Sequence, residues 1–265
     1  MPGADSNPMH DTPDERLEVP FQTPPSLDLT NTALFLDLDG TLADIAQTPD
    51  AVVPVAHRTR VLKALAPALG GRLAVLSGRS IAEVDRILEG SVASVAGLHG
   101  LDRRTRDGAL DATPPHPALS DARECLSQMA KAQHGLLLED KGTSVALHYR
   151  LRPDAGPAVI DCARRLARQT GLALQEGHMV AELRTPGPDK GEALEAFMAE
   201  PPFAGARPIM IGDDLTDEDA FAAAVALGGE AILIGLPRRS RARWRLEDPT
   251  ALLSWLDASL APVRA

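Results

Sequence analysis

The feature that most limits the fold of this sequence is a series of short apolar runs, each followed by polar residues. The runs stand at residues 33–36, 73–76, 92–96, 208–211 and 231–234. Short, mainly apolar runs of this length are typical of strands that are buried on both faces. Between the first three runs, apolar residues at helical spacing over 55–69 and a capping box of Ser80 and Glu83 predict two helices. This alternation predicts a parallel sheet that is covered by helices.

The middle of the sequence has a different pattern. Turn pairs at Asp107-Gly108, Lys141-Gly142 and Glu176-Gly177 lie within or between short runs, which is typical of hairpins. The predicted strands cover residues 136–140, 143–149, 172–176 and 179–183, and the predicted helices cover residues 118–132 and 155–169. Hairpins combined with helices predict an antiparallel sheet with helices on one face, which is an α+β unit.

The parallel pattern resumes after this unit. Asp189 is predicted to cap a helix at 190–199, and Thr216, with Asp219 at the third position, is predicted to cap another. Apolar spacing over 249–259 predicts a last helix. The sequence therefore predicts an α/β core that is interrupted by an inserted unit.

The chain divides into three predicted parts. Residues 31–101 and 185–265 form the core, and residues 102–184 form the inserted α+β domain. Residues 1–30 carry six prolines and no apolar periodicity, so we expect a disordered or loosely attached tail.

Polar residues gather where the predicted core strands end. Because ligands bind beyond the carboxyl ends of strands in open parallel sheets, we expect these residues to converge on one edge. Each short motif alone is common in turns and helix starts, whereas their order and placement together are much more specific. The residues are Asp37, Asp39, Gly40, Thr41, Ser77, Arg79, Lys190, Asp213, Asp214 and Asp217.

This collection suits phosphoryl transfer. Clustered carboxylates raise one another's pKa unless a cation neutralises them, and Mg²⁺ prefers carboxylates together with substrate phosphate. An Asp nucleophile can accept a phosphoryl group, and a second Asp can move the protons. Lys190, a hydroxyl and backbone N–H groups can stabilise the transferred group. Gly40 allows the chain to turn sharply beside the phosphate.

In that order, these motifs resemble those of the haloacid dehalogenase superfamily, and more closely those of the trehalose-6-phosphate phosphatases within it. The resemblance covers roughly residues 33–258. The matching stretches are LDLDGTL (36–42), SGR (77–79), GLHG (97–100), KGTSVALHYR (141–150), KG (190–191) and GDDLTDEDAF (212–221). The resemblance implies a haloacid dehalogenase-like Rossmannoid core in which the α+β insertion is a cap over the site.

The resemblance also implies roles for individual residues. Asp37 would be the nucleophile and a Mg²⁺ ligand, Asp39 would be the general acid and base, and its backbone carbonyl would bind the metal. Ser77 and Lys190 would hold the phosphoryl group, and Asp213 would be the third metal ligand. Two further carboxylates would hold metal-bound waters or Lys190, namely Asp214 and Asp217. The implied reaction is the hydrolysis of trehalose 6-phosphate to trehalose and phosphate, the last step of trehalose biosynthesis.

A sugar phosphate needs a polar site. The candidate substrate-binding residues are Gly40, Thr41, Arg79, His99, Gly100, Arg103, Lys141, Ser144, His148, Arg150, Glu176, His178 and Glu182. For His148, two interpretations are open. Either it binds the sugar, or it simply faces solvent on the side of the strand opposite the apolar Leu147. The sequence departs from the family at Gly177-His178, where the family usually has Gly-Lys, while Glu182 is in place.

Composition limits the possible partners. The net charge of −10 disfavours nucleic acid and anionic membranes as partners. The start of the sequence lacks the pattern of a secretory signal, and Cys125 and Cys162 lack a metal-binding spacing, so we expect reduced cysteines in a cytoplasmic protein. We expect a monomer that acts on a small molecule with Mg²⁺ as its cofactor.

Two alternatives stay open at this stage. One is another sugar-phosphate phosphatase of the same superfamily, for example one that acts on sucrose phosphate or glucosyl-glycerate phosphate. The other is a non-catalytic module that senses a sugar phosphate. The presence of Asp39 argues against the second, because a binding module needs no additional carboxylate for proton transfer.

Overall fold

The structure is a computed structural model that describes residues 21–46, 48–177 and 179–261. Its larger sheet contains β1 (Thr32–Leu36), β2 (Leu73–Leu76), β3 (Ser94–Gly97), β4 (Asp102–Arg104), β5 (Leu110–Ala112), β10 (Arg207–Gly212), β11 (Glu230–Ile234) and β12 (Trp244–Leu246). The strand order is β12-β11-β10-β1-β2-β3-β4-β5. The pairings from β12 through β3 are parallel, while β4 and β5 continue the sheet in antiparallel pairings.

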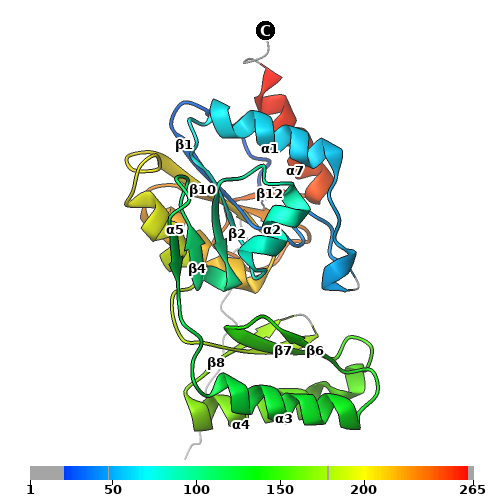
Figure 1. The fold of residues 1–265 in the computed structure, drawn as a ribbon. Coiled ribbons are helices and arrows are strands. Elements are labelled where there is room, and N and C mark those ends of the chain that lie inside the picture. The colour runs from blue at the N-terminus through cyan, green and yellow to red at the C-terminus, as the bar shows by residue number, and fades with distance from the viewer. Residues whose placement is uncertain (1–20, 47, 178, 262–265) are drawn as a thin grey trace, which may run out of the picture.

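Helices cover both faces of this sheet (Figure 1). They are α1 (Ala56–Ala68), α2 (Ile81–Leu88), α5 (Lys190–Met198), α6 (Glu218–Ala226) and α7 (Pro249–Ser259). Strand alternation divides the core, because Leu34 and Leu36 of β1 pack with α1, α2 and α7. Phe35 of the same strand packs on the opposite face with Phe197 of α5 and Phe221 of α6. The buried runs of the sequence thus become strands with two covered faces, as predicted.

The inserted unit has its own sheet, in the order β6-β7-β9-β8. The strands are β6 (Leu137–Asp140), β7 (Ser144–His148), β8 (Ala173–Gly177) and β9 (Val180–Arg184), and the helices are α3 (Leu119–Ala132) and α4 (Gly156–Thr170). Val145, Leu147 and Leu183 pack against Leu126 and Val159 of the two helices. The sheet lies between these helices and the core, so its second face is turned toward the core (Figure 1). The predicted parallel-sheet core with an inserted α+β unit is confirmed.

Three local expectations differ from the structure. Residues 102–112 were expected in the inserted domain, but β4 and β5 pair with β3 in the larger sheet. The expected N-cap Thr216 does not cap a helix, because the carboxylate of Asp214 accepts the N–H of Leu215 and caps a 3-10 turn that precedes α6. The three-residue strand β12 escaped prediction because its run is short and contains Arg245.

Part of the expected N-terminal tail packs on the core. Leu27 is buried, and its N–H donates to Ser259 Oγ. The indole of Trp255 donates to the carbonyl of Pro25. Pro25 and Leu27 therefore lie against α7, while Gln22 forms a bridge with Trp244 of β12. The rest of the expected tail, residues 1–20, lies outside the described residues.

The two cysteines are free thiols between α3 and α4, with Cys125 Sγ 4.0 Å from Cys162 Sγ. Among the described residues, none of the helices is long and apolar enough to cross a membrane.

Candidate active site

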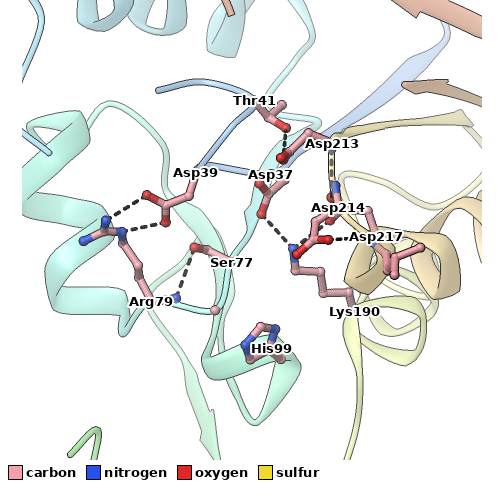
Figure 2. A network of polar contacts seen from close by, with 12 residues as sticks. Asp37, Asp39, Thr41, Ser77, Arg79, His99, Lys190, Asp213, Asp214 and Asp217 are labelled. Carbon is pink, nitrogen blue, oxygen red and sulfur yellow. Dashed lines mark hydrogen bonds and ion pairs between the residues drawn. The ribbon is translucent and has the colours of Figure 1, made fainter. Parts of the chain in front are cut away.

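The carboxyl ends of β1, β2 and β10 bring the predicted residues together. β1 lies between β2 and β10, so Asp37, Ser77 and Asp213 follow three neighbouring strand ends. Lys190 joins them from the first turn of α5, where the side chain of Asp189 caps the helix by accepting the N–H groups at its start. Figure 2 shows these side chains pointing toward one another.

Lys190 bridges two carboxylates. Its Nζ donates to Asp37 Oδ1 and to Asp217 Oδ1, both at 2.7 Å, and the three side chains are buried. Burial alone would lower the pKa of Lys190, but the charges of Asp217 and Asp37 outweigh it and raise that pKa. Lys190 therefore stays protonated and fixes the position of Asp37.

The site holds more negative than positive charge. Asp37, Asp213 and Asp217 each offer an oxygen within 4.8 Å of the others. Burial, together with Asp217 and Asp213, raises the pKa of Asp37 in spite of Lys190. Burial and then Asp217 raise the pKa of Asp213 to about 7. A divalent cation would remove this conflict, and oxygen ligands of this kind suit a hard cation such as Mg²⁺.

The hydrogen bonds separate the carboxylates by role. Both oxygens of Asp217 are engaged: Oδ1 accepts from Lys190, and Oδ2 accepts the N–H groups of Asp213 and Asp214 at 3.0 and 3.1 Å. Asp37 and Asp213 each keep one carboxylate oxygen that accepts no hydrogen bond within the described part of the chain. These two residues thus each keep an oxygen that could contact a metal ion.

Gly40 and Thr41 shape the surroundings of Asp213. Gly40 has a φ of +86°, and a Cβ at this position would lie 2.1 Å from Asp213 Oδ2, so only glycine fits. Thr41 Oγ1 donates to Asp213 Oδ1 at 3.0 Å. The structure thus brings both predicted substrate-binding residues to the carboxylate of Asp213.

Asp39 is held from the other side of the site. Arg79 donates from Nε to Asp39 Oδ2 and from Nη2 to Asp39 Oδ1, both at 2.7 Å (Figure 2). The N–H of Arg79 also donates to Ser77 Oγ at 3.1 Å. The side chain of Asp39 is 36% exposed, whereas that of Arg79 is 9% exposed. Asp39 therefore faces the open part of the site.

The polar face of the inserted sheet closes the site from the opposite side. A cavity of about 230 Å³ lies between the two parts, lined by Asp37, Asp39, Ile45, Ala46, Thr48, Gly78, Arg79, His99, Glu139, Lys141, His148, Arg150, Gln175, Gly177, Lys190, Asp214 and Thr216. Hydrogen bonds cross it, because Lys141 Nζ lies 3.4 Å from the carbonyl of Gly78 and Arg150 Nη1 donates to the carbonyl of Ala46 at 2.8 Å.

Glu182 is the centre of the polar network on the inserted sheet. It accepts from Lys141 Nζ at 3.2 Å and from the hydroxyl of Ser144, and its Oε2 lies 3.7 Å from His99 Nε2. Burial opposes its charge, but Lys141, His99 and Ser144 outweigh burial and lower its pKa far below the usual range. Glu182 is therefore an ionised carboxylate that ties the inserted sheet to the core.

Comparisons with known proteins bear on this geometry. The profile of the trehalose-phosphatase family matches residues 35–248, a span that includes every residue of the acidic cluster. The chain belongs to the trehalose-phosphatase family. Members of this family are phosphoric monoester hydrolases, and this chain is one, as the motifs predicted.

Two curated relatives match over most of their length. A probable trehalose-phosphate phosphatase of Sinorhizobium fredii is 42% identical over 80% of this chain and 81% of the relative. The trehalose-6-phosphate phosphatase of Escherichia coli is 40% identical over 85% of each chain.

Solved structures agree with the family's fold. The crystal structure of a trehalose-6-phosphate phosphatase related protein has a TM-score of 0.75 at 25% identity, over 87% of this chain and 98% of the other. A phosphatase of the haloalkanoate (HAD) superfamily from Bacteroides thetaiotaomicron has a TM-score of 0.59 at 14% identity, over 89% and 97% of the two chains. The haloacid dehalogenase-like fold that the motifs predicted is confirmed.

Two candidate substrate-binding residues lie away from the cavity. Arg103 of β4 forms a two-point ion pair with Glu200, at 3.1 Å for each bond, and lies over the ring of Phe197. Glu176 lies on the other face of β8 and pairs with Arg164 of α4 at 2.9 Å. Alternation along β8 turns the side chain of Glu176 away from the cavity, and the pairing of β4 with β3 puts Arg103 in the core sheet.

The remaining candidates differ in position. His99 and Arg150 line the cavity, and so does His148, whose Nε2 lies 2.7 Å from Glu139 Oε2. Gly100 is buried against the carbonyl of Asp189, which a Cβ would approach to 2.4 Å, so it supports the start of α5. His178 lies outside the described residues.

Glu139 and Gln175 line the cavity but were missed. The register puts Glu139 opposite Ala146, Ala146 opposite Glu182, and Glu182 opposite Gln175, so all four share one face. The amide nitrogen of Gln175 lies 3.0 Å from His99 Nε2. Counting two residues back from Lys141 finds Glu139, whereas finding Gln175 requires the pairing of β8 with β9.

Proposed function

We propose that this enzyme hydrolyses trehalose 6-phosphate to trehalose and phosphate through an aspartyl phosphate on Asp37, with Mg²⁺ as its cofactor. The observation that carries the proposal is the meeting of two surfaces. A buried acidic cluster with one ammonium group faces a sheet whose cavity-lining side chains are polar. Such a site suits a phosphate monoester joined to a hydroxyl-rich group. Family membership and the names of both relatives support this substrate.

In the first step, a carboxylate oxygen of Asp37 attacks phosphorus and the bond from phosphorus to the sugar oxygen breaks. Lys190 holds Asp37 in position and places positive charge beside the phosphoryl group. Asp39, two residues further on, donates a proton to the sugar oxygen as it leaves. The hydroxyl of Ser77, at the end of β2, would bind a phosphoryl oxygen; Figure 2 shows it on the same side of the site as Lys190 and Arg79.

In the second step, water attacks the phosphorus of the aspartyl phosphate, Asp39 takes the proton of that water, and the bond to Asp37 breaks. Asp37, Asp213 and the backbone carbonyl of Asp39 would hold Mg²⁺, which supplies positive charge to the phosphoryl oxygens. Asp217 positions Lys190, and Asp214 lines the cavity beside it.

The two-point contact with Arg79 has a consequence for Asp39. Arg79 donates to both oxygens of Asp39, so this carboxyl group has to leave the guanidinium before it can reach the sugar oxygen. A phosphate dianion in the cavity competes for Arg79 and loosens this pair. Arg79 is therefore placed to link substrate entry to the release of Asp39.

The inserted sheet would bind the sugar. Lys141 and Glu139 line the cavity and offer a donor and an acceptor to hydroxyl groups, and His148 and Arg150 lie beside them. Glu182 lies behind this surface and holds Lys141 in position. We keep the expectation that the protein is a cytoplasmic monomer. Size-exclusion chromatography with light scattering would test the oligomeric state.

A substrate panel tests the proposal. Phosphate release should be fastest from trehalose 6-phosphate, much slower from glucose 6-phosphate and sucrose 6-phosphate, and absent after chelation of Mg²⁺. A preference for sucrose 6-phosphate would favour another sugar-phosphate phosphatase, and binding without any turnover would favour a sensing module.

A further inference from the structure

An arginine-rich segment follows β11, with Arg238, Arg239, Arg241, Arg243 and Arg245 within eight residues. β11 is the parallel neighbour of β10, so the segment leaves the sheet at the same edge as Asp213. None of the catalytic roles proposed above uses it. One of its arginines, Arg238, nevertheless contacts the loop that carries Asp213 and Asp214.

Arg238 binds the backbone of that loop. Its Nη2 donates to the carbonyl of Asp214 at 2.8 Å and to the carbonyl of Asp213 at 3.3 Å, and its Nε lies 3.4 Å from the same Asp213 oxygen. Its Nη1 donates to the carbonyl of Arg239 at 3.2 Å and to Glu218. One planar guanidinium thus holds two consecutive peptide groups.

The N–H groups of the same two residues are held as well. The N–H groups of Asp213 and Asp214 both donate to Asp217 Oδ2, the carboxylate that also accepts from Lys190. The turn is therefore fixed through its N–H groups by Asp217 and through its carbonyl groups by Arg238. The peptide group between Asp213 and Asp214 is thus held at its N–H by Asp217 and at its carbonyl by Arg238, which restrains the backbone that carries the Asp213 side chain.

Glu218 anchors Arg238 in turn. Its carboxylate pairs with Arg238 Nη1 and accepts the N–H of Arg241 at 2.9 Å. Glu218 is the first residue of α6, where a negative charge interacts favourably with the helix dipole. The Arg238 and Glu218 side chains are only 24% and 20% exposed, so the pair is less screened than a surface ion pair.

We propose that Arg238 is a positioning residue for the metal site, because it aims the carboxylate of Asp213 at Asp37. The proposal rests on the proposed metal-dependent function. A purely structural ion pair would affect the melting temperature alone. A positioning residue must also change the affinity for the metal, and residues that orient metal ligands typically change it by about 10- to 100-fold.

The test is Mg²⁺ binding by isothermal titration calorimetry on full-length, chelator-treated protein. Arg238→Gln should weaken the Mg²⁺ Kd by about tenfold or more and reduce the rise in Tm on adding Mg²⁺. Arg238→Lys keeps the positive charge but cannot bind both carbonyl groups in the same way. Its affinity for Mg²⁺ should therefore lie between those of the wild type and Arg238→Gln. Arg239→Gln, at an exposed neighbouring position, is the matched control and should stay within twofold of the wild type.

The outcomes separate the two proposals. If the wild type binds Mg²⁺ and folded Arg238→Gln binds it within twofold of the wild type, the positioning role is wrong while the proposed function stands. If Arg238→Gln fails to fold, Arg238→Lys decides in the same way, because a lower Tm with unchanged affinity would show a structural pair only. If the wild type itself binds no Mg²⁺, the metal-dependent function is wrong and the role of Arg238 falls with it.

Discussion

Replacing Lys190 by methionine removes the one ammonium group between Asp37 and Asp217. Methionine keeps the length and the apolar stem of the side chain, so the change is mainly one of charge. Both carboxylates are at most 7% exposed and would face each other without a cation. Breaking a buried ion pair in this way typically costs about 3–5 kcal/mol. For a chain of this size, we expect a fall in Tm of roughly 6–20 °C, at about 2–4 °C per kcal/mol.

The pH dependence of this loss follows from the pKa of Asp37. That pKa is already raised in the folded protein, and loss of Lys190 raises it further. A carboxyl group whose folded pKa exceeds its unfolded pKa binds protons more tightly when folded, so stability falls as the pH rises through the folded value. The variant should therefore be closest to the wild type at low pH and furthest from it at high pH.

The assay is thermal unfolding followed by circular dichroism from pH 5 to pH 8, with a chelator present so that no metal replaces the ammonium group. Lys63→Met, on the exposed side of α1, is the control for loss of a lysine and should keep the wild-type Tm. A Lys190→Met protein that is as stable as Lys63→Met at pH 8 would refute the interpretation of Lys190 as the charge that holds the cluster together.

Three further predictions concern activity. Asp37→Asn should abolish turnover and keep the far-ultraviolet circular dichroism spectrum; substantial residual phosphate release would exclude Asp37 as the nucleophile. Chelation of Mg²⁺ should abolish phosphate release and added Mg²⁺ should restore it, and full activity in excess chelator would contradict a metal role for Asp213. Glu182→Ala should lower kcat/KM for trehalose 6-phosphate by about 10- to 100-fold, which corresponds to about 1.4–2.7 kcal/mol and is typical of hydrogen bonds to a charged group. Glu176→Ala should leave kcat/KM unchanged, because Glu176 pairs with Arg164 on the helix side; equal effects of the two variants would contradict the placement of Glu182.

The core and its acidic cluster could be predicted because their determinants are local. A buried strand that ends at Asp37 needs only its own apolar run to be recognised, and the parallel pattern then places its end beside Asp213. Whether residues 102–112 join the core sheet could not be predicted in this way, because it depends on which edge strand of the sheet is free to pair with them. β4 is short, contains two arginines and pairs with β3, and no periodicity within its own sequence shows that pairing.

The same distinction explains the results for the inserted domain. Alternation within β7 correctly separates His148 from Leu147, because side-chain direction is a property of one strand. The position of Arg103 and the contact of Gln175 with His99 depend on pairing between segments far apart in the sequence. Arg238 belongs to this second class, because its partners, Glu218 and the backbone carbonyls of Asp213 and Asp214, lie 20 or more residues away in the sequence.

The charge distribution joins these observations. A chain of net charge −10 binds a phosphate dianion only if the local charge differs from the global one. Lys190, Arg79 and Lys141 line the cavity, but each is already paired with a carboxylate, whereas the lining Arg150 donates to the carbonyl of Ala46. The buried carboxylates are thus neutralised only in part, so under the proposed function we expect a divalent cation to strengthen substrate binding. This argument predicts that Mg²⁺ lowers KM as well as raising kcat, and an effect of Mg²⁺ on kcat alone would show that the paired cations attract the phosphate without it.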